Sequence, residues 1–290
     1  MIADQIAQQG AAQIDFITPH ITDAHTLDYP CLHTGFVCEY ALPRWDPIHI
    51  GRFAIDISPT RHVVMLLIAA FLCIVTMLLA LRAHNQKTRE GKAPSGFGNG
   101  LEAVVLYLRN EVILPNVGPH GNGYVPFLLT LFFFILFANL LGLIPYGSTA
   151  TGNISVTATL AIVTFVVIEL AGIKAQGKAY INTILFWPDD MSLGTKLLIS
   201  PILTPIEIIG KLTKPFALAI RLFANMTAGH VVLLALISLI FTFGSWYVVP
   251  FPIVMGIAIS VLELFVAILQ AFIFTLLSSV FIGLIREGAH

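Results

Sequence analysis

Long runs of apolar residues, separated by short polar segments, dominate the chain from residue 63 onward. The first run, Val63–Leu81, contains no charged residue and is long enough to cross a hydrocarbon core of about 30 Å. Two further runs of similar length, Tyr124–Ile144 and Ser155–Ile173, are joined by a turn rich in Gly, Ser and Thr. This pattern predicts three membrane-spanning helices of ordinary length.

The last third of the chain holds two longer apolar runs, Pro201–Gly244 and Phe251–Ile285. At 1.5 Å per residue, the second run makes a helix of about 52 Å, which fits within a bilayer only at a tilt beyond about 50°. We therefore expect a hairpin of two helices that lie nearly along the membrane. A break or kink is expected in the first of them at its prolines, Pro201, Pro205 and Pro215.

A shorter segment, Leu101–Ile113, alternates apolar residues with Glu102, Arg109 and Glu111 at helical spacing. This amphipathic pattern predicts a helix on the cytoplasmic face of the membrane. The whole pattern thus predicts an all-α membrane protein with about five membrane helices: one outer vertical helix, a vertical pair and the steeply tilted C-terminal hairpin, plus the surface helix.

Composition and charge agree with this class. Hydrophobic residues make up 57% of the chain and charged residues 11%, against about 25% in soluble proteins, which excludes a single water-soluble core. The net charge of −1 gives no basis for bulk nucleic-acid binding. Basic residues follow the first, third and last runs (Arg82, Lys174 and Arg286), which predicts that these ends, including the C-terminus, are cytoplasmic and that the N-terminus lies outside.

The domain organisation follows from the same pattern. Residues 1–61 form a polar tail on the outer side, residues 62–290 form the membrane domain, and residues 196–286 form its helical hairpin. In the tail, Cys31 and Cys38 either form a disulfide, which an oxidising periplasm permits, or remain free thiols. Both alternatives stay open at this point.

Polar groups within the last two helices are the strongest functional signal. Arg221, His230, Glu263 and Gln270 lie inside apolar stretches. A guanidinium at membrane depth costs from about 3 to more than 10 kcal/mol unless it is paired or hydrated, and snorkelling to the interface is the simpler alternative. Because Arg221 lies well inside its stretch, we favour a hydrated path or the charge of a partner.

The spacing of these four groups predicts how they pair. In an antiparallel hairpin, residues at one level have nearly the same sum of residue numbers. This rule places Arg221 level with Gln270, and His230 level with Glu263. One pair is then free to face a partner while the other lines a polar pocket.

Other classes of function are less well supported. Gly172–Ala179 resembles a phosphate-binding loop, but Ala179 cannot supply the hydroxyl that binds Mg²⁺, so we expect nucleotide to be bound by another chain. We expect no metal and no cofactor, because the histidines of the tail lack a metal-binding spacing and no H-E-x-x-H motif of a membrane hydrolase is present. A secondary ion antiporter is the alternative function, although such proteins usually contain inverted repeats.

Three segments carry a resemblance to a known family. Lys214–His230, with its Arg-Leu-Phe-x-Asn segment, closely resembles the signature of subunit a of the F-type ATP synthase. Leu269–Leu277 is similar to the final helix of that family, and Asn139–Pro145 resembles a third motif. The resemblance runs from about residue 60 to the C-terminus.

The resemblance implies a non-catalytic stator in the bacterial inner membrane. Its partners would be a ring of small hairpin subunits that each carry one carboxylate, the peripheral stalk, the catalytic head and the lipid membrane. Arg221 would face the ring carboxylate, with Asn225 and Gln270 as neighbours. The acid and the histidine of the hairpin, at 263 and 230, are exchanged relative to many members, which bears on the order in which a proton visits them.

Two offset half-channels would then couple proton flow to rotation. The outer half-channel would involve His230, Glu263 and Asn139. The inner half-channel would include Glu207, or else Glu207 is an interface carboxylate near Lys211 at i, i+4. The two roles of Glu207, in the inner half-channel or at the interface, remain alternatives.

Overall fold

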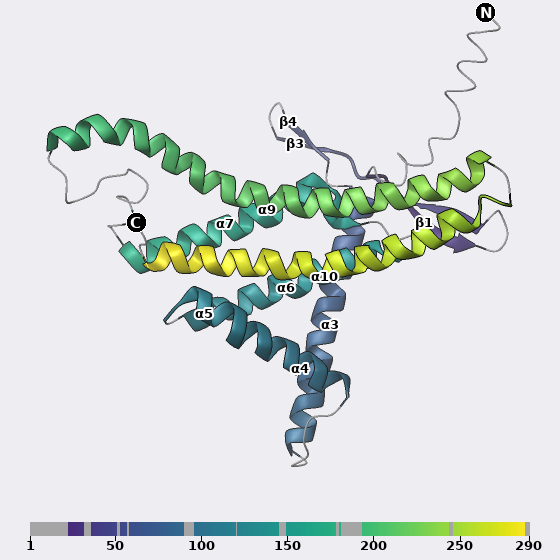
Figure 1. The fold of residues 1–290 in the computed structure, drawn as a ribbon, viewed down its shortest axis with the longest axis horizontal. Coiled ribbons are helices and arrows are strands. Elements are labelled where there is room, and N and C mark those ends of the chain that lie inside the picture. The colour runs from purple at the N-terminus through teal and green to yellow at the C-terminus, as the bar shows by residue number, and fades with distance from the viewer. Residues whose placement is uncertain are drawn as a thin grey trace, which may run out of the picture. The chain divides into compact units, whose positions relative to one another are not determined.

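The computed structural model describes residues 23–31, 36–50, 53–56, 58–89, 96–119, 121–144, 149–177, 180, 193–243 and 246–287. Among these residues, five helices are long and apolar enough to cross a membrane, which confirms the predicted class (Figure 1). They are α3 (Arg61–Arg89), α6 (Val125–Gly142), α7 (Ile154–Gln176), α9 (Leu193–Phe243) and α10 (Pro250–Glu287).

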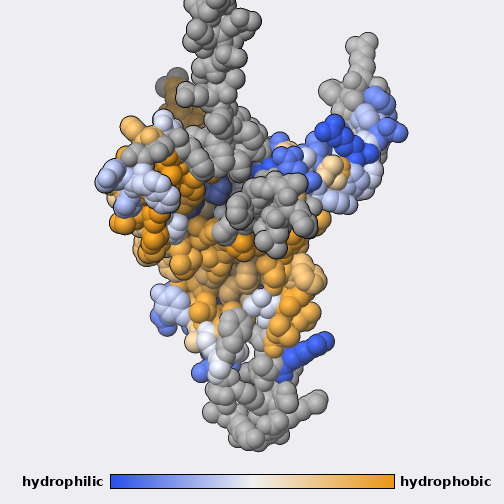
Figure 2. Space-filling view, turned by 90° about the vertical axis from the view of Figure 1, so that its right-hand side faces the viewer, coloured by the Kyte–Doolittle hydropathy of each residue, from blue (hydrophilic) through white to orange (hydrophobic). Residues whose placement is uncertain are grey.

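The start of α10 follows the prediction from proline, whereas α9 begins at Leu193, before the predicted Pro201, and α3 continues past Arg82 to Arg89. Pro250 opens α10, at a position where its missing N–H would have no partner within the helix. At 1.5 Å per residue, α10 is about 57 Å long and α9 about 77 Å, both far beyond a perpendicular crossing of about 30 Å. Many of their exposed side chains are large and apolar, among them Ile202, Phe216 and Phe265, and Figure 2 shows that the middle of the face in view is mainly hydrophobic.

Of the break or kink expected at the prolines of the first hairpin helix, the structure shows a bend without a break. The helix α9 runs without interruption through Pro201, Pro205 and Pro215, and Figure 1 shows it as one ribbon that bends in its N-terminal half. Each proline removes one backbone hydrogen bond, which bends a helix without ending it when the remaining bonds of the turn persist.

The predicted surface helix is present and longer than the pattern indicated. It consists of α4 (Phe97–Tyr107), a π-helical segment (Leu108–Ile113) and α5 (Leu114–Val117). The exposed side of α4 includes Val104 and Tyr107, whereas Ile113 and Val117 are fully buried. The second half of this helix is therefore a packing element of the fold.

Two small β-hairpins occupy the described part of the N-terminal tail, where the sequence predicted only a polar segment. The strand β1 (Thr26–Cys31) pairs antiparallel with β2 (Phe36–Ala41), and β3 (Ile48–Ile50) pairs with β4 (Phe53–Ile55). Cys38 is disulfide-bonded, while Cys73 in α3 is a free, buried thiol. For Cys38, the structure therefore shows the oxidised one of the two alternatives. The first 22 residues of the predicted tail lie outside the described residues.

The chain divides into two compact units. Unit 1 comprises Met1–Ala69, Ala138–Asn153 and Phe223–Ala267, and unit 2 comprises Ala70–Phe137, Ile154–Leu222 and Ile268–His290. Unit 2 has a hydrophobic core built from the surface helix, α6, α7 and α10. Its buried members include Ile113, Leu128, Ile168 and Ile282.

A close approach of two backbones fixes α10 in unit 2. A Cβ added at Gly283 would lie only 1.9 Å from the carbonyl oxygen of Asn116. Only glycine fits there, because any side chain would collide with main chain that cannot swing aside. The C-terminal end of α10 is thus pressed directly onto α5.

Candidate functional site

In unit 1, a histidine and a carboxylate face each other across the hairpin. His230 lies on the same face of α9 as the buried Met226 and Leu234, and Glu263 lies on the same face of α10 as the buried Ala267. The distance from His230 Nδ1 to Glu263 Oε1 is 3.9 Å, and Glu263 is only 7% exposed. The predicted level pairing of these two residues is confirmed.

Room for the Glu263 carboxylate is provided by a glycine next to the histidine. A Cβ added at Gly229 would lie 2.8 Å from Glu263 Oε1 and 3.1 Å from its Cδ. Any larger residue at 229 would therefore displace the carboxylate. The absence of a side chain at Gly229 sets the position of Glu263 beside His230.

A buried polar chain connects α6 to α10 in the same unit. The amide of Asn139, 1% exposed, donates from Nδ2 to the carbonyl oxygen of Ala267 at 3.3 Å. Its Oδ1 accepts a hydrogen bond of 2.7 Å from the hydroxyl of Thr151, which lies in a short 3₁₀ turn (Ala150–Gly152). Because Ala267 is one turn after Glu263, Asn139 reaches the helix that carries the carboxylate.

Two further contacts support this arrangement. Thr227, one turn before the His230 position on α9, donates to the carbonyl oxygen of Gly152 at 3.5 Å. A Cβ at Gly142 would lie 1.9 Å from the hydroxyl oxygen of Thr149, so α6 ends against the same turn. The turn at 149–152 is thus held from α6 and from α9.

In unit 2, Arg221 and Gln270 have opposite environments. Arg221 is exposed, together with Ala217 and Ile220, whereas Leu218 and Leu222 beside it are buried. Within the part of the chain that the structure describes, no carboxylate forms an ion pair with Arg221. Gln270 is 1% exposed, on a face of α10 that also buries Ala271 and Phe274. That Arg221 and Gln270 lie at the same level of the hairpin stays a prediction.

Asn225 lies one turn after Arg221 in α9 and is also exposed. Its expected place beside the arginine along one face of the helix is consistent with this exposure. Its role stays a prediction.

Glu207 is half-buried in the N-terminal part of α9, and the structure shows its neighbour Lys211 engaged elsewhere. The Lys211 ammonium donates to the hydroxyl of Tyr180 at 3.4 Å and lies 4.7 Å from the centre of its ring. Among the described residues, Glu207 has no salt bridge, so the i, i+4 pair with Lys211 is not formed there.

Tyr180 links Lys211 to a second carboxylate. Its hydroxyl donates a hydrogen bond to the carboxylate of Glu169 in α7. Burial, followed by the hydrogen bond to Glu169 and the charge of that carboxylate, raises the pKa of Tyr180. Gly172 provides room for the ring, since a Cβ there would lie 2.6 Å from it. A chain of polar groups therefore joins α7 to α9 in unit 2.

The junction of the tail with α3 is a separate polar cluster in unit 1. His62 Nδ1 lies 2.8 Å from Asp23 Oδ1, and Arg61 Nε donates to the carbonyl oxygen of Thr26 at 3.2 Å. Burial raises the pKa of Asp23, but hydrogen bonds from Thr60 and His62 and the charge of His62 outweigh it, so the net pKa is lowered. This cluster ties β1 to the first turn of α3.

No group of three or more His, Cys, Asp or Glu side chains converges within the described ranges as a metal ion would require. Sequence reasoning identified Asn139, His230 and Glu263 but missed Gly229, Thr151 and Tyr180. These three residues contact segments that are distant in the sequence, and no local sequence pattern indicates such contacts.

Comparison with known proteins identifies the family. Residues 63–283 match the family described as ATP synthase A chain. The chain is 45% identical over 284 residues to ATP synthase subunit a 2 of Chlorobaculum tepidum, which covers 97% of this chain and 76% of the relative. It is 44% identical over 265 residues to ATP synthase subunit a of Chloroherpeton thalassium, covering 91% and 74%, and 43% identical over 277 residues to that of Anaeromyxobacter dehalogenans, covering 93% and 70%. The chain therefore belongs to the ATP synthase A chain family.

Proposed function

We propose that the chain is the proton-conducting stator of a rotary ATP synthase, with two offset half-channels and with Arg221 facing the carboxylate of a rotating ring. The observation that carries the proposal is the exposure of Arg221 on α9 within an apolar stretch. A guanidinium in that position requires water or a counter-charge, and a neighbouring subunit supplies the counter-charge.

Membership of the family settles the coarser statement. The chain is the membrane-sector subunit a of an ATP synthase, is not catalytic on its own, and crosses the bacterial inner membrane several times. This membership favours the stator over a secondary ion antiporter, the alternative considered from sequence.

The surroundings of Arg221 support an interface with another protein. Ala217 precedes it by one turn and is exposed, and Ala224 and Ala228, which follow it on the helix, are exposed as well. Small side chains allow another membrane helix to approach closely. A ring helix passing this face would bring its carboxylate to the arginine.

The chemistry at the arginine is a change in the charge of the passing carboxylate. A carboxylate facing lipid must be protonated, because an ion there is too costly. A nearby guanidinium favours the ionised form, so the proton is released as the carboxylate reaches Arg221. The fixed positive charge also repels protons from the direct route between the half-channels.

The outer half-channel consists of Glu263 and His230, with Asn139 at its base. The 3.9 Å between the histidine and the carboxylate exceeds a direct hydrogen bond but retains a strong electrostatic interaction in a site of low exposure. Asn139 holds α6 against α10 through Ala267, which keeps the carboxylate in place.

The inner half-channel includes Glu207, with the Glu169–Tyr180–Lys211 chain as its wall. These groups are the polar side chains that unit 2 gathers around the N-terminal part of α9. Asn225, one turn after Arg221 in α9, and Gln270 of α10 are assigned to positioning the arginine.

The same proposal assigns topology and partners. Residues 1–61 lie outside, residues 62–290 form the membrane domain, and the hairpin 196–286 faces the ring. The basic ends of α7 and α10, at Lys174 and Arg286, support a cytoplasmic C-terminus by the positive-inside rule. The peripheral stalk and the catalytic head complete the complex.

The test is ATP-driven acidification of inverted membrane vesicles. We expect Arg221→Ala to abolish pumping while the complex still assembles. Arg221→Lys should retain little pumping, because the lysine ammonium lacks the planar, forked donor groups of a guanidinium. The matched control is Arg82→Ala, which removes an exposed arginine directly after the first apolar run, Val63–Leu81. Pumping at the wild-type rate in an assembled Arg221→Ala complex would refute the proposed role.

A further inference from the structure

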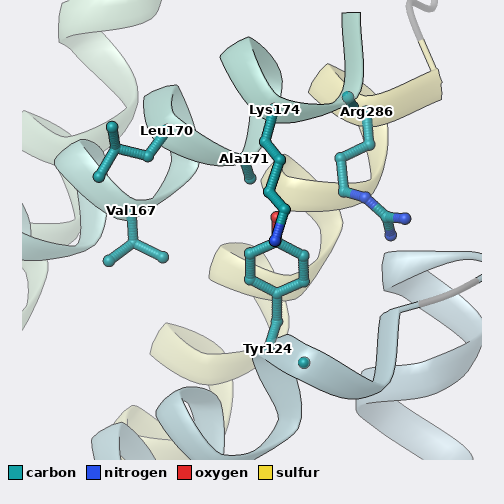
Figure 3. Close-up of a pocket in the computed structure, with 8 residues that line it drawn as sticks. Tyr124, Val167, Leu170, Ala171, Lys174 and Arg286 are labelled. Carbon is teal, nitrogen blue, oxygen red and sulfur yellow. The ribbon is translucent and has the colours of Figure 1, made fainter.

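A pocket of about 490 Å³ opens in unit 2 where α7, α10 and the turn that precedes α6 meet. Figure 3 shows its lining: Lys174 descends from α7, Tyr124 rises from the 3₁₀ turn (Gly121–Tyr124) that precedes α6, and Arg286 extends from α10. The volume lies within the range of about 300–1,000 Å³ that is typical of small-molecule sites. Neither half-channel uses this pocket.

The polar side of the pocket is positively charged. Lys174 lies in the last turn of α7 and Arg286 in the last turn of α10, so both mark the level at which apolar helices reach water. No acidic residue is among the lining residues, and Lys174 has no ion pair within the described part of the chain. Two cations therefore face one cavity without a carboxylate in its wall.

The position of the Arg286 guanidinium is fixed. It donates to the carbonyl oxygens of Val117 at 2.7 Å and Pro119 at 2.8 Å, and it lies 5.5 Å from the centre of the Tyr124 ring. These acceptors are neutral, so they hold the guanidinium without neutralising its charge. A preorganised cation of this kind binds an anion without the cost of ordering a flexible side chain.

The other side of the pocket is apolar and continues along the membrane. Val167 and Leu170 line it from α7. Beyond them, Val166, Val163 and Ile162 are exposed on the next turns of the same helix. A cationic pocket at the water boundary thus leads into an apolar track of about 18 Å, from Lys174 to Ile162 at 1.5 Å per residue.

We propose that this pocket binds an anionic phospholipid, with the headgroup phosphate between Lys174 and Arg286 and an acyl chain along α7. Basic pockets between membrane helices favour anionic headgroups, each cation contributing about 1 kcal/mol near the surface. Free phosphate shares the charge chemistry of the pocket but makes no use of the apolar track.

The experiment uses the complete ATP synthase in mild detergent with a photoactivatable phosphatidylglycerol. After illumination, peptides covering residues 163–175 are analysed for lipid adducts. We expect adducts there in the wild type and about fivefold fewer in Lys174→Gln, the factor that corresponds to about 1 kcal/mol. Lys174→Arg should retain them, and the matched control Arg82→Gln should not change them.

A second variant keeps the test valid if Lys174→Gln fails to assemble. Ala175 is exposed and lines the pocket, so Ala175→Trp fills the cavity while both cations remain. We expect it to lower the adducts as well. Photoactivatable phosphatidylcholine labelling these peptides equally well would overturn the proposal, as would labelling unaffected by either variant.

Two further results would also overturn it. If inorganic phosphate displaces the probe as effectively as unlabelled phosphatidylglycerol, the pocket is a site for free phosphate. If the wild type gives no adducts at residues 163–175, a partner subunit covers this face instead of lipid.

Discussion

Replacing Gly229 by alanine is the most direct way to move the Glu263 carboxylate without changing its chemistry. The added methyl carbon would lie 2.8 Å from Glu263 Oε1, whereas ordinary contact begins at 3.4 Å, so the two must separate by at least 3.4 − 2.8 = 0.6 Å. Glu263 is only 7% exposed, and the carboxylate therefore has little free space in which to move. We expect it to shift away from His230.

The size of the effect follows from the 3.9 Å distance between His230 Nδ1 and Glu263 Oε1. For an imidazolium and a carboxylate, Coulomb's law with an effective dielectric constant of about 20 gives about 4.3 kcal/mol at this distance. Lengthening it by 0.6 Å removes about 0.6 kcal/mol, which corresponds to a factor of about three in their coupling. We therefore expect Gly229→Ala to slow proton pumping about threefold, and Gly229→Val to slow it further.

The assay is ATP-driven acidification of inverted vesicles, normalised to the amount of assembled complex. The matched control is Gly256→Ala in α10, where an added Cβ would meet nothing within 4 Å. Both substitutions replace a helical glycine and raise helix propensity by about 1 kcal/mol, so they differ only in the contact with Glu263. Wild-type pumping in Gly229→Ala, or an equal loss in Gly256→Ala, would show that the carboxylate position does not limit transfer.

Three further predictions test other parts of the structure. Exchanging the pair, His230→Glu with Glu263→His, should restore more pumping than either single substitution, because the two side chains face each other; a double variant no better than the worse single would show that they act separately. Gly283→Ala should lower the free energy of unfolding of the complex by more than about 1 kcal/mol, since the added Cβ would meet the Asn116 carbonyl oxygen at 1.9 Å. Gly100→Ala, where the added Cβ meets open space, should leave it unchanged. Equal melting temperatures of the two variants would contradict the backbone contact. The pKa of Asp23 is lowered in the folded protein, so the stabilisation that Asp23 gives to the contact between β1 and α3 is present above its unfolded pKa of about 3.9 and is lost as the pH falls through the folded pKa. Hydrogen-exchange protection of β1 should therefore decrease below about pH 4 in the wild type and vary less in Asp23→Asn. Identical pH profiles would exclude the Asp23–His62 contact as the anchor.

The membrane helices were predictable from sequence because one physical requirement dominates them. Charge is excluded from the hydrocarbon core, so the charge-free run Val63–Leu81 falls within α3 and the run Phe251–Ile285 falls within α10. The pairing of His230 with Glu263 was predictable for a related reason, since a hairpin of two straight helices leaves one register for a given turn.

Features that depend on a second segment were not predictable. The hairpins of the tail are short and their alternation is weak, and the strand β1 even includes Pro30. The three prolines predicted a break or a kink in α9 without deciding between them, and the structure shows a bent but continuous helix. The need for Gly229 arises entirely from Glu263 on another helix, and the partner of Asn139, Thr151, lies in a turn that carries no motif.

The central claim is that the face of α9 that bears Arg221 meets the ring, and site-specific photo-cross-linking tests it most directly. A photoreactive amino acid at Ala217 or Ala224, both exposed beside the arginine, should form adducts with the small ring subunit in the assembled complex. The same probe at Ile162, which is 60% exposed on α7, should form none with the ring. Ring adducts from position 162 together with none from 217 and 224 would contradict the account.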